Sequence, residues 1–249
     1  MTKLIAWAVT GAGHFLAGSF SLMEKLVKEY DVKVTTFLSN AAVDTIRIYG
    51  FNDRLTKISD GSYYSEVLKE DDEGPASPNA ARLSKGVYSV LIVSPATANT
   101  VAKIAMGIAD NLVTNAVAHA GKGRVQVLVV PTDQENVTET VLPAMVDRDA
   151  CRACEVCPPI EKCPHSAVSR INGKARIDLS ECQGAGVCEE ACPYGAITVN
   201  KSVKVKSRKV DLDNVDRLKG MENIRVLKDP TKIISELLLE IGIEARKQN

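Results

Sequence analysis

The 249-residue sequence is notable first for what it lacks. No cysteine occurs in residues 1–150 or 193–249, and aromatic residues make up only 4% of the chain. No apolar run approaches the roughly 20 residues of a membrane-spanning helix. Lysine plus arginine (31) balance aspartate plus glutamate (31), so no net charge points to nucleic acid or to an anionic membrane. These absences favour a soluble globular protein.

The N-terminal apolar run, residues 4–9, is six residues long, has no cleavage site after it and is soon followed by Gly11. It therefore indicates no signal peptide, and we expect a cytoplasmic protein. Because a reducing compartment disfavours disulfides, the seven cysteines crowded between Cys151 and Cys192 point instead to metal ligation.

Short apolar or β-branched runs alternate with helix-periodic stretches through the first 146 residues. This alternation predicts an α/β domain whose parallel sheet is covered on both faces. Ligands of such sheets bind beyond the carboxyl ends of the strands, here in the loops 11–14, 39–40 and 94–99. Residues 51–86 are less regular and are expected to form surface loops around a short helix. The expected strands are 3–10, 32–38, 87–93 and 124–130, and the expected helices are 14–30, 40–49, 97–106 and 110–120.

The pattern changes near residue 147, where a short segment rich in cysteine and proline begins. That segment is too small for an apolar core of its own, so bound metal must stabilise it. A strand at 221–227 and a helix at 230–246 then resume the α/β pattern, after an exposed edge strand around 203–206 whose lysines could alternatively dock an acidic partner. We therefore divide the chain into an α/β domain (1–146), a cluster-binding insertion (147–200) and a return to the first domain (201–249).

The cysteines form two runs that resemble the repeats of two-cluster ferredoxins. The first is Cys151-x2-Cys154-x2-Cys157-x5-Cys163-Pro164, and the second is Cys182-x5-Cys188-x3-Cys192-Pro193. In such ferredoxins the last cysteine of each repeat ligates the cluster of the other repeat.

This crossover predicts one complete and one incomplete site. Cys151, Cys154, Cys157 and Cys192 supply four thiolates for a [4Fe–4S] cluster. The second site has only Cys163, Cys182 and Cys188, because Ala185 stands where the remaining cysteine would be. That site holds either a [3Fe–4S] cluster or a [4Fe–4S] cluster whose fourth iron takes another ligand.

Zinc is the main alternative, because C-x2-C pairs also make tetrahedral zinc sites. Against zinc, seven cysteines do not divide into tetrads, and no histidine has zinc-finger spacing; His165 directly follows Pro164. The paired C-P repeats favour iron–sulfur clusters.

A glycine-containing turn, Gly11-Ala12-Gly13-His14, follows the first expected strand. Backbone N–H groups in such a turn can cradle a phosphate. However, the third glycine of the dinucleotide motif is missing, and a tight strand-to-helix turn without a ligand explains the same residues equally well.

Residues 94–100 (SPATANT) and 107–112 (GIADNL) favour a flavin. Together with the glycine turn they resemble the homo-oligomeric FMN-containing cysteine decarboxylase superfamily over residues 3–146, which implies a flavodoxin- or Rossmann-like sheet and bound FMN. The FMN contacts that the resemblance implies are Gly11, Ala12, Gly13, His14, Ser39, Asn40, Ser94, Ala96, Thr97, Asn99, Ala109 and Asp110.

One departure from that superfamily concerns its chemistry. The decarboxylases carry a catalytic histidine between their second and third strands, whereas residues 40–93 here contain none. Decarboxylation is therefore disfavoured. Of the three histidines, His14 is expected near the flavin and His119 on a helix surface.

A flavin domain with an inserted two-cluster, ferredoxin-like domain is similar to iron–sulfur flavoproteins of the dihydromethanopterin reductase type. The resemblance implies reduction of dihydromethanopterin to tetrahydromethanopterin, with reduced ferredoxin or a similar protein as the electron donor. It also implies a trimer-based homo-oligomer. The alternative function is a non-catalytic electron carrier in which flavin and clusters only relay electrons, and no catalytic residue is assigned.

Overall fold

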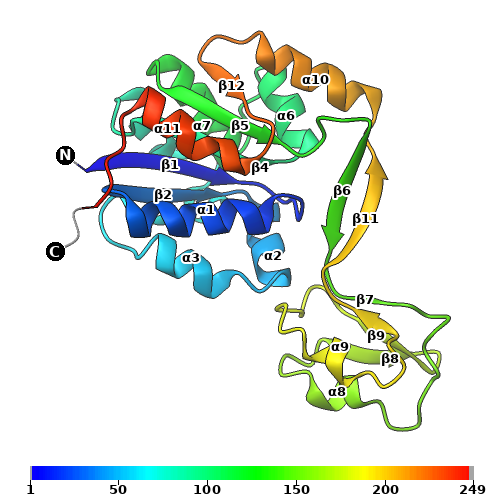
Figure 1. Ribbon diagram of the computed structural model, residues 1–249. Helices are drawn as coiled ribbons and strands as arrows, with labels where there is room; N and C mark the ends of the chain where they lie inside the picture. The colour runs from blue at the N-terminus through cyan, green and yellow to red at the C-terminus, as the bar shows by residue number, and fades with distance from the viewer. Residues whose placement is uncertain (1, 247–249) are drawn as a thin grey trace.

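The computed structural model describes residues 2–246, so residue 1 and residues 247–249 of the predicted domains lie outside it. Six parallel strands form the central sheet in the order β12-β5-β4-β1-β2-β3 (Figure 1). Strand order reverses between β1 and β4, as in doubly wound Rossmann sheets. This confirms the predicted fold class. The strands are β1 (Lys3–Val9), β2 (Val32–Leu38), β3 (Val67–Lys69), β4 (Val90–Ala96), β5 (Gln126–Pro131) and β12 (Ile224–Val226).

Helices cover both faces of this sheet (Figure 1), because successive side chains of the buried strands point to opposite faces. From β1, Ile5, Trp7 and Val9 enter one core while Ala6 and Ala8 enter the other. Helices α1 (Leu16–Glu29), α2 (Asn40–Ile48), α3 (Asn52–Ile58) and α11 (Ile233–Glu240) contribute to the first core. Helices α5 (Ala81–Ser84), α6 (Ala98–Ala105), α7 (Leu112–Lys122) and α10 (Lys209–Lys219) contribute to the second.

The sequence prediction was wrong in detail in several places, and it missed helix α10. Residues 51–86 are more regular than expected, since they add α3, β3 and the short α4 (Glu70–Glu73). Strand β4 does not end before Ser94 but continues to Ala96, which pairs with Pro131. The last helix is shorter than predicted and begins after a turn of 3₁₀ helix at Pro230–Lys232.

A two-stranded antiparallel ribbon leaves the α/β domain (Figure 1). It pairs β6 (Val137–Leu142) with β11 (Lys201–Lys206). The predicted exposed strand near 203–206 therefore belongs to this ribbon and not to the edge of the main sheet. The lysine side chains of β11 are exposed.

The ribbon leads to a small lobe that contains all seven cysteines (Figure 1). Its two apolar clusters are small, and cysteines are members of both. The lobe is built from β7 (Met145–Val146), α8 (Pro158–Lys162), β8 (Val168–Ile171), β9 (Lys174–Ile177), α9 (Val187–Ala191) and β10 (Ile197–Thr198). Within residues 2–246, no helix has the length and apolar character needed to cross a membrane.

Candidate cofactor-binding sites

The loops that follow β1, β2 and β4 meet at the carboxyl edge of the sheet, where strand order reverses. The Thr10 hydroxyl donates to the Pro95 carbonyl (2.8 Å) and accepts from the Thr97 amide (2.9 Å). The Ser39 amide donates to the Val9 carbonyl (3.3 Å). The structure thus brings together the loops of the glycine turn, Ser39 and Thr97, as predicted for a ligand-binding edge.

Close packing explains both glycines of the turn. A Cβ atom on Gly11 would lie 2.5 Å from the Cβ of Ala41 in α2, and one on Gly13 would lie 2.2 Å from the Tyr49 hydroxyl oxygen. A side chain at Gly11 would push the turn away from α2, and one at Gly13 would displace the Tyr49 side chain. The Ala12 amide donates to the Thr10 carbonyl (2.8 Å), which holds the turn tight.

Two of the predicted residues cap helices at this edge. Ser39 Oγ accepts from the Ala42 amide at the start of α2 (3.2 Å), and Thr97 Oγ1 accepts from the Thr100 amide at the start of α6 (3.3 Å). The hydroxyls and N–H groups at these two helix starts are of the kind that bind an anionic phosphate. At the start of α2, however, the Asn40 amide already donates to the Glu70 carboxylate (3.2 Å).

The remaining predicted residues are placed differently. Asn99 is exposed on the first turn of α6, and exposed Asn40 donates to Asp71 (2.7 Å). Ser94 and Ala96 are fully buried, and Ser94 Oγ pairs with Ser19 Oγ (2.8 Å) inside the domain.

Ala109 and Asp110 lie apart, on the turn between α6 and α7. Both oxygens of the Asp110 carboxylate accept from Lys103 Nζ at 2.8 Å, which holds the pKa of Asp110 below its usual value. Ala109 lines a separate cavity of about 160 Å³ that also includes Gly121 and Met221. Among residues 2–246, the hydrogen bonds of Asp110 go to Lys103 and Thr114, and none reaches the glycine turn.

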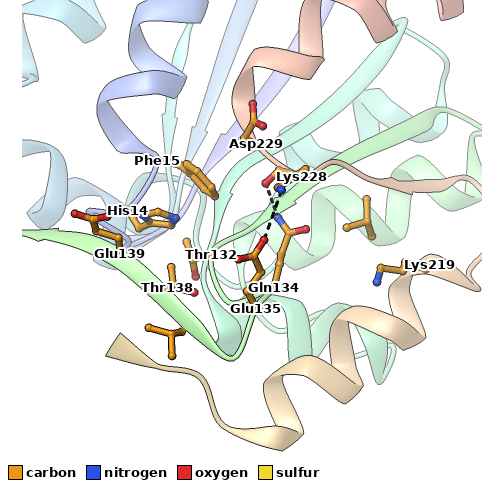
Figure 2. Close-up of a pocket in the computed structure, with 12 residues that line it drawn as sticks. His14, Phe15, Thr132, Gln134, Glu135, Thr138, Glu139, Lys219, Lys228 and Asp229 are labelled. Carbon is orange, nitrogen blue, oxygen red and sulfur yellow. Dashed lines mark hydrogen bonds and ion pairs between the residues drawn. The ribbon is translucent and has the colours of Figure 1, made fainter. Parts of the chain in front are cut away.

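A larger cavity of about 540 Å³ opens beside the glycine turn (Figure 2). His14 and Phe15 lie on one side, Thr138 and Glu139 of β6 come from the ribbon, and further lining residues follow β5 and β12. Its lining residues are His14, Phe15, Thr132, Gln134, Glu135, Val137, Thr138, Glu139, Lys219, Val226, Lys228 and Asp229.

The Gln134 side chain in this cavity is held by the ends of two neighbouring strands. Gln134 Nε2 donates to the carbonyls of Pro131 (2.9 Å) and Leu227 (3.0 Å), which joins the ends of β5 and β12. Thr132 and Gln134 were missed from the sequence, although the rule that ligands bind after strand ends applies equally to the loop after Pro131.

The histidines occupy distinct environments. Burial lowers the pKa of His14, against the opposing effect of Asp133 and Glu139, so its imidazole is neutral at neutral pH. Its ring packs on Phe15 with a centroid distance of 3.8 Å. His119 is not a simple surface residue as predicted: it is partly buried, and its Nδ1 has no hydrogen-bond partner in residues 2–246.

In the lobe, the cysteines surround two separate hollows. Cys151, Cys154, Cys157 and Cys192 line one hollow, together with Pro193 and Tyr194. This is the group of four that the ferredoxin crossover predicts. The Ala175 amide donates to Cys151 Sγ (3.5 Å) and is the main cause of the lowered pKa of that thiol.

The second hollow is lined by Cys163, Cys182 and Cys188, the predicted group of three. Ala185 lies in its wall as expected, and burial raises the pKa of Cys188. His165 also lines this hollow. It was missed from the sequence, although its position directly after Cys163-Pro164 could have indicated it.

The thiols border hollows and do not converge on a point. All seven cysteines are free of disulfides, and within residues 2–246 no three His, Cys, Asp or Glu side chains converge on a single-ion site. Two hollows, each bordered by cysteines from both runs, fit the reach that cubane-type clusters require.

Comparison with known proteins matches both parts of the chain. Residues 1–149 match the family model "Flavoprotein", and residues 175–198 match "4Fe-4S binding domain". A dihydromethanopterin reductase (acceptor) of Methanosarcina mazei is 47% identical over 92% of this chain and 97% of its own length. One from Methanocaldococcus jannaschii is 44% identical over 92% of this chain and 94% of its own.

Among solved structures, the FMN complex of Burkholderia xenovorans DmrB, a cubic protein cage for redox transfer, has a TM-score of 0.60. It is 26% identical, and the match covers 94% of this chain and 93% of that one. The chain therefore belongs to the flavoprotein family, alongside the dihydromethanopterin reductases (acceptor), and combines the flavoprotein domain with a 4Fe–4S-binding domain.

Proposed function

We propose that this protein is a reductase that passes electrons through two iron–sulfur clusters to FMN and on to dihydromethanopterin. Residues 1–146 and 201–249 form the flavin part and residues 147–200 the cluster part. The observation that carries the proposal is the grouping of the seven cysteines into two hollows on a lobe joined to a flavoprotein sheet. The two full-length relatives named for this activity support the substrate.

The described residues fit both cofactors. In the four-cysteine hollow, Cys151, Cys154, Cys157 and Cys192 would hold a [4Fe–4S] cluster. Cys163, Cys182 and Cys188 would hold the second cluster. Because Ala185 offers no thiolate, the fourth iron of that cluster would take another ligand or be absent. FMN would lie at the glycine turn, its phosphate near the N–H groups and the caps Ser39 and Thr97.

The cavity beside His14 is our proposed substrate pocket. Its volume of about 540 Å³ is within the range of small-molecule sites, roughly 300–1,000 Å³. Phe15 offers an aromatic face for a flat ring, and the carboxylates of Glu135 and Asp229 can accept from pterin N–H groups.

The overall reaction adds two electrons and two protons across one C=N bond of the dihydropterin. Bound FMN supplies the conversion of single electrons into a pair. The chain's own residues position the two ring systems and exclude water. His14, neutral at neutral pH, is placed to hold a hydrogen bond in the cavity and not a charge.

The proposed donor is reduced ferredoxin or a similar one-electron protein, and the proposed assembly is a homo-oligomer built from trimers. The Burkholderia protein forms a cubic cage. This supports the proposal that the present protein also assembles from many copies. The exposed Met106 and Ile108, on the same turn as Asp110, are apolar residues that such an assembly would cover.

Anaerobic oxidation of the chemically reduced holoprotein by dihydromethanopterin tests the proposal. We expect tetrahydromethanopterin to form in proportion to the electrons withdrawn, with bleached clusters and flavin recovering their absorbance. Reoxidation no faster than in a mixture of free FMN and an unrelated ferredoxin would support the alternative, a carrier without this activity.

A further inference from the structure

The loop of the three-cysteine site packs directly against the carboxyl end of α2 in the α/β domain. Arg47 Nη1 donates to the Cys182 carbonyl (2.7 Å) and to the Leu179 carbonyl (3.0 Å). These bonds join residues more than 130 positions apart in sequence. The Arg47 side chain is only 22% exposed and is also paired with Asp44 at 3.0 Å.

Backbone meets backbone at the same place. Gly184, which lines the three-cysteine hollow, has φ +65°, and a Cβ there would lie 2.4 Å from the Gly50 nitrogen. It would also lie 2.7 Å from the carbonyl carbon of Tyr49. Only glycine allows this approach, so the contact is a close-fitted junction between lobe and domain.

The other side of this junction is the glycine turn. The Tyr49 hydroxyl donates to the Val141 carbonyl of the ribbon at 2.5 Å, and burial raises the pKa of that hydroxyl. The same oxygen is the atom that a Cβ on Gly13 would strike. Residues 47–50 therefore lie between the glycine turn and the loop of the three-cysteine site, with contacts on both sides.

The four-cysteine site is held differently. Its comparable arginine belongs to the lobe itself: Arg170 donates to the carbonyls of Cys154 (2.6 Å) and Glu155 (3.1 Å). Val156 and Tyr194 beside it are 61% and 54% exposed. This site borders solvent, whereas the other is backed by the α/β domain.

We propose that the three-cysteine site is the flavin-proximal one and that Arg47 and Tyr49 are the positioning residues that hold it against the flavin domain. The four-cysteine site is then the distal one. The inference rests on the proposed function, because it assumes that both sites hold clusters and that FMN lies at the glycine turn. A guanidinium beside the Cys182 carbonyl also favours the reduced, more negative state of the proximal site.

The test is an anaerobic redox titration of the holoprotein, followed by EPR, on wild type, Arg47→Ala, Arg47→Lys and the matched control Arg170→Ala. Arg47→Ala should lower the midpoint potential of the three-cysteine site alone. Arg47→Lys, which keeps the positive charge, should have a midpoint potential close to that of wild type. Arg170→Ala should instead affect the four-cysteine site. Equal shifts at both sites in Arg47→Ala, or none, would overturn the proposal.

Hydrogen exchange on the same proteins gives a second readout that needs no activity. Amides in residues 179–186 should exchange faster in Arg47→Ala than in wild type or Arg170→Ala. In Tyr49→Phe, which loses the bond to the Val141 carbonyl, amides of the ribbon around Val141 should exchange faster instead. Unchanged exchange in both variants contradicts the junction, even if one variant loads iron poorly. Wild-type protein that binds neither clusters nor FMN would refute the proposed function instead, which separates the two failures.

Discussion

The α/β domain and the cysteine lobe are stabilised by different means. The domain buries large apolar side chains such as Trp7, Phe20 and Phe37 completely, on both faces of its sheet. The lobe has two small apolar clusters, in which Cys182 and Cys188 stand among the few buried members. Hydrophobic burial is enough to fold the domain, while the lobe depends on what its thiols bind.

Removing iron should have the largest effect, because it should unfold the lobe and leave the α/β domain folded. Anaerobic treatment with a chelator under reducing conditions is expected to abolish hydrogen-exchange protection throughout residues 147–200, since metal binding there is also folding energy. Protection in β1 and β4 should persist. Retained protection in the lobe after complete iron loss would show that its apolar clusters suffice.

A substitution that leaves a cavity in the domain core should destabilise the α/β domain and leave the lobe unchanged. Phe20→Ala removes a fully buried ring and is expected to lower the free energy of unfolding of the domain by about 3–5 kcal/mol. Denaturant unfolding followed by Trp7 fluorescence measures it. The control Leu239→Ala changes a residue that is 79% exposed, and its effect should stay within about 0.5 kcal/mol. If Phe20→Ala lost its iron at a lower denaturant concentration than its domain structure, the stability of the lobe would not be independent of the domain core.

Adding a fourth thiol to the three-cysteine site tests whether Ala185 stands at the position of the missing ligand. Ala185→Cys adds a thiol to the wall of the three-cysteine hollow and should produce an ordinary four-thiolate [4Fe–4S] cluster there. The EPR signal of one cluster should change while the other is unaltered. Ala185→Ser, with a hydroxyl in place of the thiol, serves as the control, and identical spectra in both variants would place the missing ligand elsewhere.

A helix cap at the binding edge gives the smallest expected effect. Ser39→Ala removes the side-chain acceptor for the Ala42 amide and should cost about 1 kcal/mol of domain stability. Ser39→Asp keeps an acceptor and should retain that stability, although its charge opposes a phosphate. Calorimetry of the FMN-free protein measures the cap alone, and the lobe should be insensitive to either change.

The sequence predicted the local features better than the contacts between distant segments. The fully buried strands and the start of α2 at Asn40 follow from short-range patterns, and so does the grouping of cysteines. Thr97 was expected inside a helix but caps α6, which begins at Ala98. Strand β3 was missed because its three residues, two half-buried and one exposed, are too few to show a periodic pattern. The pairing of β6 with β11 was missed because it joins segments about 60 residues apart.

The junction at residues 47–50 could not have been predicted from the sequence. Tyr49 and Gly50 look like an ordinary helix end, and Gly184 looks like part of a cysteine loop. Only the fold brings them within contact distance and gives Arg47 its two carbonyl partners.

The most direct test of the central claim is to count iron and FMN per chain in anaerobically purified protein, with the EPR spectrum of the reduced form. Two clusters predict about seven or eight iron atoms per chain, one FMN, and two cluster signals. In Cys154→Ser, iron should fall by about half while the three-cysteine signal remains. Stoichiometric zinc, or a flavin-free protein with a single cluster, would contradict the account.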